Sequence, residues 1–208
     1  MFVPKNMHMQ GNDTIVQFIK DHSFGILVSE SLEATHIPFI FSPDEGEKGV
    51  LYGHIAKANP QCKQLAQENA LVIFNGPHGY ISPTWYENGP GVPTWNYAAV
   101  HCRGRATLLN DAHTIETMNR LVAKYEPNLL NDEVLMPQDY QAKLRQAVVG
   151  FKIDIEHIDA KEKLGQQRKI ADQHGVHTAL STSDALGDKQ LANYMQRRQL
   201  GVGAINQP

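Results

Sequence analysis

The sequence LYGHIAKANP, residues 51–60, runs from a strand pattern directly into a helix start and leaves a lysine at the junction. Side-chain character alternates from Leu51 to Ala56, with the period of two that is typical of a strand with one buried face. Asn59 stands at the expected N-cap of the helix and Pro60 at its first position, where a missing N–H costs nothing. The unpaired N–H groups of such a turn and the ammonium of Lys57 would attract an anion, so the segment predicts a phosphate site. A capped surface helix with a solvated lysine is the alternative that this segment leaves open.

Composition excludes several classes of protein. The chain has 208 residues, enough for one domain with a large core and a smaller arm. With 19 basic and 22 acidic residues its net charge is −3, which argues against coating nucleic acid or membrane through bulk charge. The N-terminus lacks the apolar run of a signal peptide, and no apolar stretch is long enough to cross a bilayer, so we expect a cytoplasmic protein. Cys62 and Cys102 form neither a disulfide framework nor a CxxC motif, and we expect two reduced thiols.

Alternating and β-branched runs predict about six strands of antiparallel type. Pro38 cannot donate a ladder hydrogen bond, so its strand must be bulged there or present an open side to a ligand or partner. Asn75–Gly79 is typical of a turn, and Gly104 marks a kink in a long strand. The runs lie at 24–29, 35–41, 51–56, 70–74, 80–82, 95–109 and 148–158.

Helices are expected at the ends of these strands and in a polar C-terminal arm. Asp111 is the expected cap of a helix whose buried face carries Ile115, Met118, Leu121 and Val122. The expected ranges are about 12–23, 60–67, 111–125, 138–147 and 188–198. The fold class is therefore α+β, a six-stranded antiparallel β-barrel over residues 1–160 with a partly helical arm over 161–208.

Four blocks in this order resemble the PaiB-type FMN-binding negative transcriptional regulators: HIAKANPQ at 54–61, GPHGYISPTWY at 76–86, VPTWNY at 92–97 and KLGQQR at 163–168. The likeness extends to FVPK at 2–5 and THIP at 35–38, and so covers most of the first 170 residues. Gly165 departs from the serine expected there. The resemblance implies a split β-barrel of the kind shared with pyridoxamine-phosphate oxidases and flavin reductases. It also implies a homodimer with FMN at the subunit interface and a role in transcriptional repression.

The resemblance assigns cofactor contacts to residues that the patterns already single out. Lys57, with the N–H groups beginning at Asn59 and Gln61, would hold the phosphate, and Thr35 and His36 can add hydrogen bonds. The remaining expected contacts are His54 and Ile55 as flavin neighbours, Trp85 and Trp95 with Tyr97 as walls for the ring, Asn96 at its polar edge, and Gln167 and Arg168 reaching the flavin or its phosphate, from either subunit. Packing at the dimer interface is the alternative for each tryptophan.

Other site chemistries find less support. His174 and His177 have a spacing that could ligate a metal, but no third ligand is evident, so we expect no metal site. Neither His36 nor His54 comes with a Ser or Asp partner that would make a hydrolytic triad, and no catalytic residue is assigned.

Three functions remain open at this stage. The first is an FMN-binding homodimer acting in gene regulation, with DNA contacted through the basic residues of the C-terminal arm, because no helix-turn-helix pattern is present. The second is a flavin-dependent oxidoreductase that takes electrons from NAD(P)H or a small-molecule substrate. The third is haem binding or breakdown, which related split barrels also support.

Overall fold

In residues 1–66 and 68–203, which the computed structural model describes, seven strands form one sheet in the order β2-β1-β5-β6-β7-β4-β3. Every pairing with a resolved register is antiparallel. The fold class is α+β, a curled antiparallel sheet of the split-barrel type with C-terminal helices, as the sequence predicts, but with seven strands where six were expected. The strands are β1 (Phe24–Ser29), β2 (Ala34–Pro38), β3 (Ile40–Ser42), β4 (Val50–Ala56), β5 (Asn69–Ile81), β6 (Thr94–Leu108) and β7 (Val148–Lys163).

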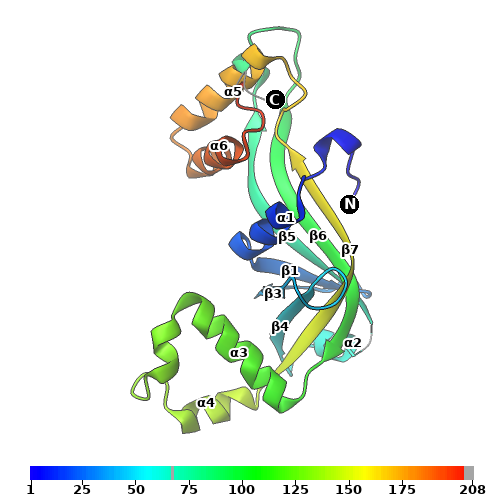
Figure 1. The fold of residues 1–208 in the computed structure, drawn as a ribbon, viewed down its shortest axis with the longest axis vertical. Helices are drawn as coiled ribbons and strands as arrows, with labels where there is room; N and C mark the ends of the chain where they lie inside the picture. The colour runs from blue at the N-terminus through cyan, green and yellow to red at the C-terminus, as the bar shows by residue number, and fades with distance from the viewer. Residues whose placement is uncertain (67, 204–208) are drawn as a thin grey trace. The chain divides into compact units, whose positions relative to one another are not determined.

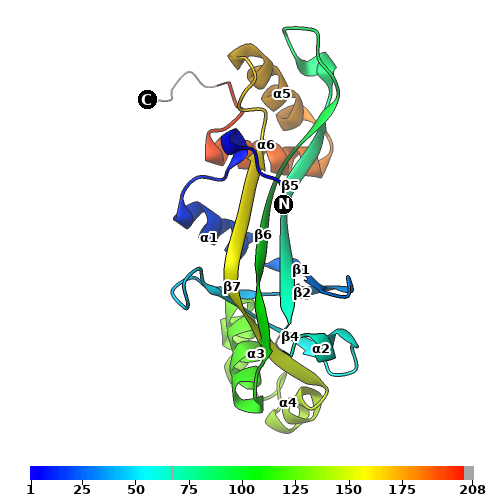
Figure 2. The same cartoon turned by 90° about the vertical axis from the view of Figure 1, so that its right-hand side faces the viewer.

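The chain divides into two compact units. The barrel unit comprises Gly11–Phe74 and Val100–Asp159, and the arm unit comprises Met1–Gln10, Asn75–Ala99 and Ala160–Pro208. Strands β5, β6 and β7 run side by side in the sheet and contribute residues to both units (Figure 2). The arm that the sequence predicts from residue 161 is thus part of a larger unit that also contains two earlier segments of the chain.

Three buried phenylalanines form the centre of the barrel unit. The ring of Phe39 meets the rings of Phe74 and Phe151 edge to face, with centroids 5.7 and 6.2 Å apart, and all three side chains are fully buried. Burial of side chains of this size contributes about 2–3 kcal/mol each. Strand β4 pairs with β7 from Val50↔Asp154 to Ala56↔Val148, and this pairing places Phe151 in the cluster.

The run at 35–41 is two strands rather than the single strand expected. β2 ends at Pro38 and pairs with β1, whereas β3 begins at Ile40 and pairs with β4. Between them Phe39 turns its side chain into the core and donates its N–H to the carbonyl of Ser23 at 2.8 Å. The break follows the proline, which cannot donate to a ladder.

The turn expected at Asn75–Gly79 is wrong, because β5 continues through it to Ile81. The resolved pairing of β1 with β5 stops at Ile73. Beyond that point β5 donates no ladder hydrogen bond to β1. A proline such as Pro77 is tolerated there because that side of the strand is unpaired.

Helices of the barrel unit depart from the expected ranges mainly at their ends. α1 (Asn12–Asp21) and α4 (Gln138–Arg145) lie close to the expected positions, and α3 (Asp111–Tyr125) is followed by the 3₁₀-helix η3 (Pro127–Asn131). α2 (Gln61–Gln64) has four residues, fewer than expected, and the expected end at Gln67 lies outside the described residues. The cap of α3 is Asn110, whose Oδ1 accepts from His113 N, and not Asp111.

The buried face of α3 also differs from the expected one. Thr114 and Thr117 are its buried residues, whereas Ile115 and Met118 are half-buried. Thr114 Oγ1 accepts a hydrogen bond from Gly150 N at 3.0 Å, and a Cβ on Gly150 would lie 2.9 Å from that oxygen. A small polar side chain that faces a glycine lets the helix approach the sheet closely. A search for periodic apolar residues cannot detect a buried face of this kind.

The arm unit is built from the 3₁₀-helices η1 (Lys5–Met7) and η2 (Pro83–Trp85) and from α5 (Ile170–Thr182) and α6 (Leu186–Arg198), which lie side by side (Figure 1). Glu162, at the end of β7, is 1% exposed and accepts from Tyr194 Oη at 2.7 Å and from Arg198 Nε at 2.7 Å, both on α6. This buried cluster fixes α6 to the strand. Among the described helices, none combines the length and apolar character that a membrane span requires.

Candidate functional site

The junction of β4 and α2 is a closed turn whose N–H groups are already bonded. Asn59 Oδ1 accepts from Gln61 N at 2.9 Å, but α2 begins at Gln61 with Pro60 in the N-cap position, one residue later than the sequence predicts. Asn59 N donates to the carbonyl of Ala56 at 2.9 Å, and Cys62 N donates to the carbonyl of Asn59 at 2.9 Å. Because these donors are used within the chain and α2 is short, an anion at this junction would depend on side chains rather than on a helix dipole.

Thr35, Asn59 and Gln61 are brought together, and they bond to one another. Thr35 Oγ1 donates to Gln61 Oε1 at 2.7 Å, and Asn59 Nδ2 donates to Thr35 Oγ1 at 3.1 Å. Gln61 is fully buried, and its Nε2 donates to the carbonyls of Leu27 and Glu33 at 3.3 and 3.0 Å. The amide of Gln61 therefore joins the turn to the β1–β2 hairpin, and its polar atoms already have partners.

Lys57 and Arg145 line one cavity of about 220 Å³ in the barrel unit, together with Thr114 and Ile115 of α3. The Lys57 side chain is exposed, and within the described residues its ammonium has no hydrogen bond or ion pair. Arg145 Nη2 donates to Gln141 Oε1 at 2.7 Å and to Asn119 Oδ1 at 3.4 Å, which holds the guanidinium in place while its other N–H groups stay available. The cavity is also lined by Asp111, Ala142 and Gln146. The cavity thus offers an anion two cations, one of them unpaired, against the single carboxylate of Asp111.

Sequence reasoning missed Arg145, because no local pattern links α4 to residue 57. The link is the pairing of β4 with β7, after which Lys57 N donates to the carbonyl of Ala147 at 2.9 Å.

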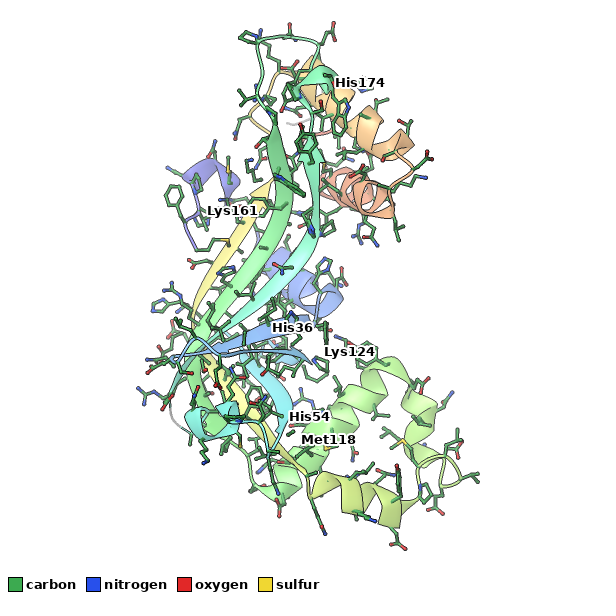
Figure 3. The ribbon with its side chains drawn as sticks, turned by 180° about the vertical axis from the view of Figure 1, so that it is seen from behind. His36, His54, Met118, Lys124, Lys161 and His174 are labelled. Atoms are coloured by element: carbon green, nitrogen blue, oxygen red, sulfur yellow. The ribbon has the colours of Figure 1, made fainter. Side chains whose placement is uncertain are left out.

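His54 is half-buried on β4 and lies beside Met118 of α3 (Figure 3). Its Nδ1 is buried and has no hydrogen-bond partner in the part of the chain that the structure describes. Burial lowers the pKa of His54 below its ordinary value, so the ring is neutral at pH 7. A ligand with a donor or acceptor near α3 would relieve this unpaired nitrogen.

His36 and Ile55 occupy different environments. His36 is exposed on β2, with its ring 6.2 Å from that of Phe24. Ile55 is 3% exposed and belongs to the core. Since β3 pairs only with Val50–Tyr52, one edge of β4 beyond Tyr52 lacks a described strand partner. Only the backbone of Ile55 is placed to meet a ligand along that edge.

In the arm unit, Trp95 and Asn96 face opposite sides of β6. Trp95 is 53% exposed and lies 6.2 and 6.4 Å, between ring centroids, from His78 and Tyr80. Asn96 is 3% exposed and lines a separate cavity with Gln167 and Arg168. Successive side chains of a strand alternate in direction, so one flat ring cannot contact both Trp95 and Asn96 of the same strand.

Trp85 is half-buried in η2 and contributes to helix packing through its backbone. A Cβ on Gly175 of α5 would lie 2.1 Å from the carbonyl oxygen of Trp85, so only glycine allows this approach. His174, next to it on α5, is labelled in Figure 3. Among the residues described, no three His, Cys, Asp or Glu side chains gather in a way that could hold a metal ion.

Comparison with known proteins adds a family match. Residues 1–157 match the family model described as "Putative FMN-binding domain". The chain is 36% identical over 203 residues to the protease synthase and sporulation protein PAI 2 of Bacillus subtilis, covering 94% of this chain and 97% of that protein. Among solved structures, the flavocytochrome Anf3 from Azotobacter vinelandii matches with a TM-score of 0.56 at 16% identity, over 77% of this chain and 72% of that one. The FAD and heme binding protein from Mycobacterium smegmatis matches with a TM-score of 0.55 at 12% identity, over 76% and 73%. At sequence identities of 16% and 12%, these structural matches support the fold alone.

Proposed function

Because the chain belongs to the "Putative FMN-binding domain" family, we propose that it binds FMN, as a homodimer, and acts in regulation as its Bacillus relative's role in protease synthesis and sporulation suggests. The observation that carries the cofactor assignment is the cavity of the barrel unit, which is lined by both Lys57, whose ammonium is unpaired, and Arg145. A phosphate group is the part of FMN that such a pair of cations suits.

The phosphate would be held by side chains. Arg145 is fixed by Gln141 and Asn119, so little freedom is lost when its remaining N–H groups bind an oxyanion. Thr35, Asn59 and Gln61 act on the turn that carries Lys57 rather than on the ligand, because they already bond to one another. His54, neutral and with an unpaired Nδ1, is the polar group of β4 that a flavin could satisfy.

Dimerisation is supported by the aromatic surface of the arm unit. Trp95 and Tyr80 are 53% and 45% exposed, and with His78 they make a patch that water solvates poorly. Exposed aromatic clusters of this kind commonly serve as contacts with another protein or with a ring system. Trp95 could contact a second subunit and a flavin at the same time.

Fewer basic side chains of the arm are free to contact DNA than the sequence indicates. Lys161 donates to the carbonyl of Phe2 at 3.2 Å, and Arg198 is paired with the buried Glu162. A DNA contact through the arm would therefore use the exposed Lys169 and Arg197. A mobility-shift titration at several salt concentrations tests it, and binding that is weak and equal for all sequences would count against it.

The cofactor assignment is tested first by the absorption spectrum of freshly purified protein and by identification of any released chromophore. FMN affinity is then measured by flavin fluorescence for the natural protein and for Lys57→Ala, Arg145→Met and the control Lys63→Ala, an exposed lysine of α2 outside the cavity. Loss of one charged hydrogen bond costs about 1.5–3 kcal/mol, or roughly tenfold to a hundredfold in affinity.

Colourless protein that does not bind added FMN would overturn the proposal. Full retention of affinity in both Lys57→Ala and Arg145→Met would overturn the phosphate site alone. Sedimentation analysis of Trp95→Ala tests the dimer contact, and anaerobic addition of NADPH shows whether a bound flavin accepts electrons, the result that would favour an oxidoreductase instead.

A further inference from the structure

The arm unit contains a cavity of about 100 Å³ on the side of β6 opposite Trp95. Its polar lining includes Asn96, Lys163, Arg168 and Asp172. The amide of Asn96 is the unusual feature. The residue is 3% exposed, and its side chain makes no hydrogen bond to any residue that the structure describes. The amide atoms are not enclosed by protein and open onto the cavity, where a ligand or water can bond to them.

Two cations reach the same cavity with donors to spare. Lys163 donates to Thr94 Oγ1 and to the carbonyl of Trp95, which uses two of its three N–H groups. The guanidinium of Arg168 lies 4.5 Å above the ring of Tyr86, and within the described chain it has no hydrogen-bond acceptor. Burial, and then the charges of Lys161 and Arg168, lower the pKa of Lys163. The positive charge of Arg168 therefore disfavours the charged form of Lys163, and a bound anion would offset this.

Asp172 sets the charge that the cavity can accept. Its Oδ1 accepts from Asn88 N at 2.9 Å and from Asn88 Nδ2 at 3.3 Å, and the backbone hydrogen bond of Asn88 lowers the pKa of this carboxyl. Asp172 is therefore ionised and bonded to Asn88. With Lys163 and Arg168 it leaves a net charge of one positive unit, which suits a monoanion better than a dianion.

Gly165 leaves one side of the cavity open. Its φ is +78°, and a Cβ there would lie 3.6 Å from Asn96 Nδ2. The serine that the family resemblance leads one to expect would add atoms beside the amide. Ile81 and Val176, both nearly fully buried, supply apolar wall. A cavity of this size holds a molecule of roughly five heavy atoms.

We propose that this cavity binds a short-chain monocarboxylate, with its carboxylate held by Asn96 Nδ2, Arg168 and Lys163 and its alkyl part against Ile81 and Val176. The resemblance assigns Asn96 and Arg168 to the flavin, whereas this proposal gives them a different ligand, and the cavity shares no residue with the phosphate site of Lys57 and Arg145. The cavity gives the protein a place to sense or to use a small organic acid.

Titration of the ¹⁵N-labelled full-length protein with sodium propionate at constant ionic strength tests the proposal. The side-chain NH₂ signals of Asn96 and the Nε–H signal of Arg168 should shift together, with a dissociation constant of about 1–10 mM for a ligand of this size. Asn96→Asp, which has the same shape and a negative charge, and Arg168→Met should each weaken binding about tenfold or more. Arg197→Met, an arginine of α6 outside the cavity, should not alter it.

Absence of any shift over the millimolar range would overturn the proposal, as would unchanged affinity in both cavity variants. Inorganic phosphate that binds more tightly than propionate would overturn the choice of a monoanion. If Asn96→Asp fails to fold by circular dichroism, Arg168→Met decides, since its stem can still pack on Tyr86. The same titration in Lys57→Ala should be unchanged, which separates this result from the outcome for FMN.

Discussion

Substitution of Arg198 should destabilise the arm unit far more than substitution of its neighbour Arg197. Arg198 Nε and Nη2 donate to Glu162 at 2.7 and 3.1 Å, and the Glu162 side chain is 1% exposed. Arg198→Met would leave a buried carboxylate with Tyr194 Oη as its main partner. Removal of one partner of a buried pair costs about 3–5 kcal/mol, and since the Arg198 side chain is 25% exposed we expect about 3 kcal/mol.

The assay is thermal unfolding followed by circular dichroism. For a chain of this length about 3 kcal/mol corresponds to a fall in Tm of roughly 6–12 °C. Arg197→Met, whose guanidinium lies only at 6.0 Å from the Tyr194 ring, should stay within about 0.5 kcal/mol of the natural protein. The double variant Glu162→Leu/Arg198→Met leaves no unpaired carboxylate at this position and should recover at least half of the loss. Equal effects of Arg198→Met and Arg197→Met, or a double variant less stable than Arg198→Met, would refute the reasoning.

Three further outcomes are expected. Gln61→Met should lower the free energy of unfolding by about 3 kcal/mol, measured in urea, because several buried partners of the amide lose their bond. Burial lowers the folded-state pKa of His54 below 6.5, so the unfolded chain binds more protons between the two values. Stability should therefore fall as the pH drops below 6.5, and urea midpoints at pH 5.5 and 7.5 should differ less in His54→Leu. Burial raises the pKa of the Cys102 thiol to about 12, so a thiol reagent at pH 8 should modify only the half-buried Cys62 in native protein, which Cys62→Ser would abolish.

Features that depend on neighbouring residues could be predicted from the sequence. The strand at 50–56 and the stop of α3 at Tyr125 follow from alternation and from proline, which act over a few residues. The break in the strand at Pro38 follows from the missing N–H of proline, which cannot donate to a ladder.

Features that depend on residues far away in the chain could not be predicted from the sequence. The sequence does not show that the Gln61 side chain is in the core, where the carbonyls of Leu27 and Glu33, some thirty residues earlier, accept from its amide. The buried face of α3 is set by Gly150, because a threonine can bond there where a larger side chain would not fit. The opposed directions of Trp95 and Asn96 were readable from strand alternation alone, and that signal separates the aromatic surface from the small cavity.

The order of strands in the sheet constrains how the protein can be made. Hairpins β1–β2 and β3–β4 join segments close in sequence, and each can form while the chain is still leaving the ribosome. The β4–β7 ladder pairs Val50 with Asp154, so about half of the chain must be synthesised in between. Until then one edge of β4 has no partner, and nascent chains stalled before residue 148 should be prone to aggregation and should bind chaperones.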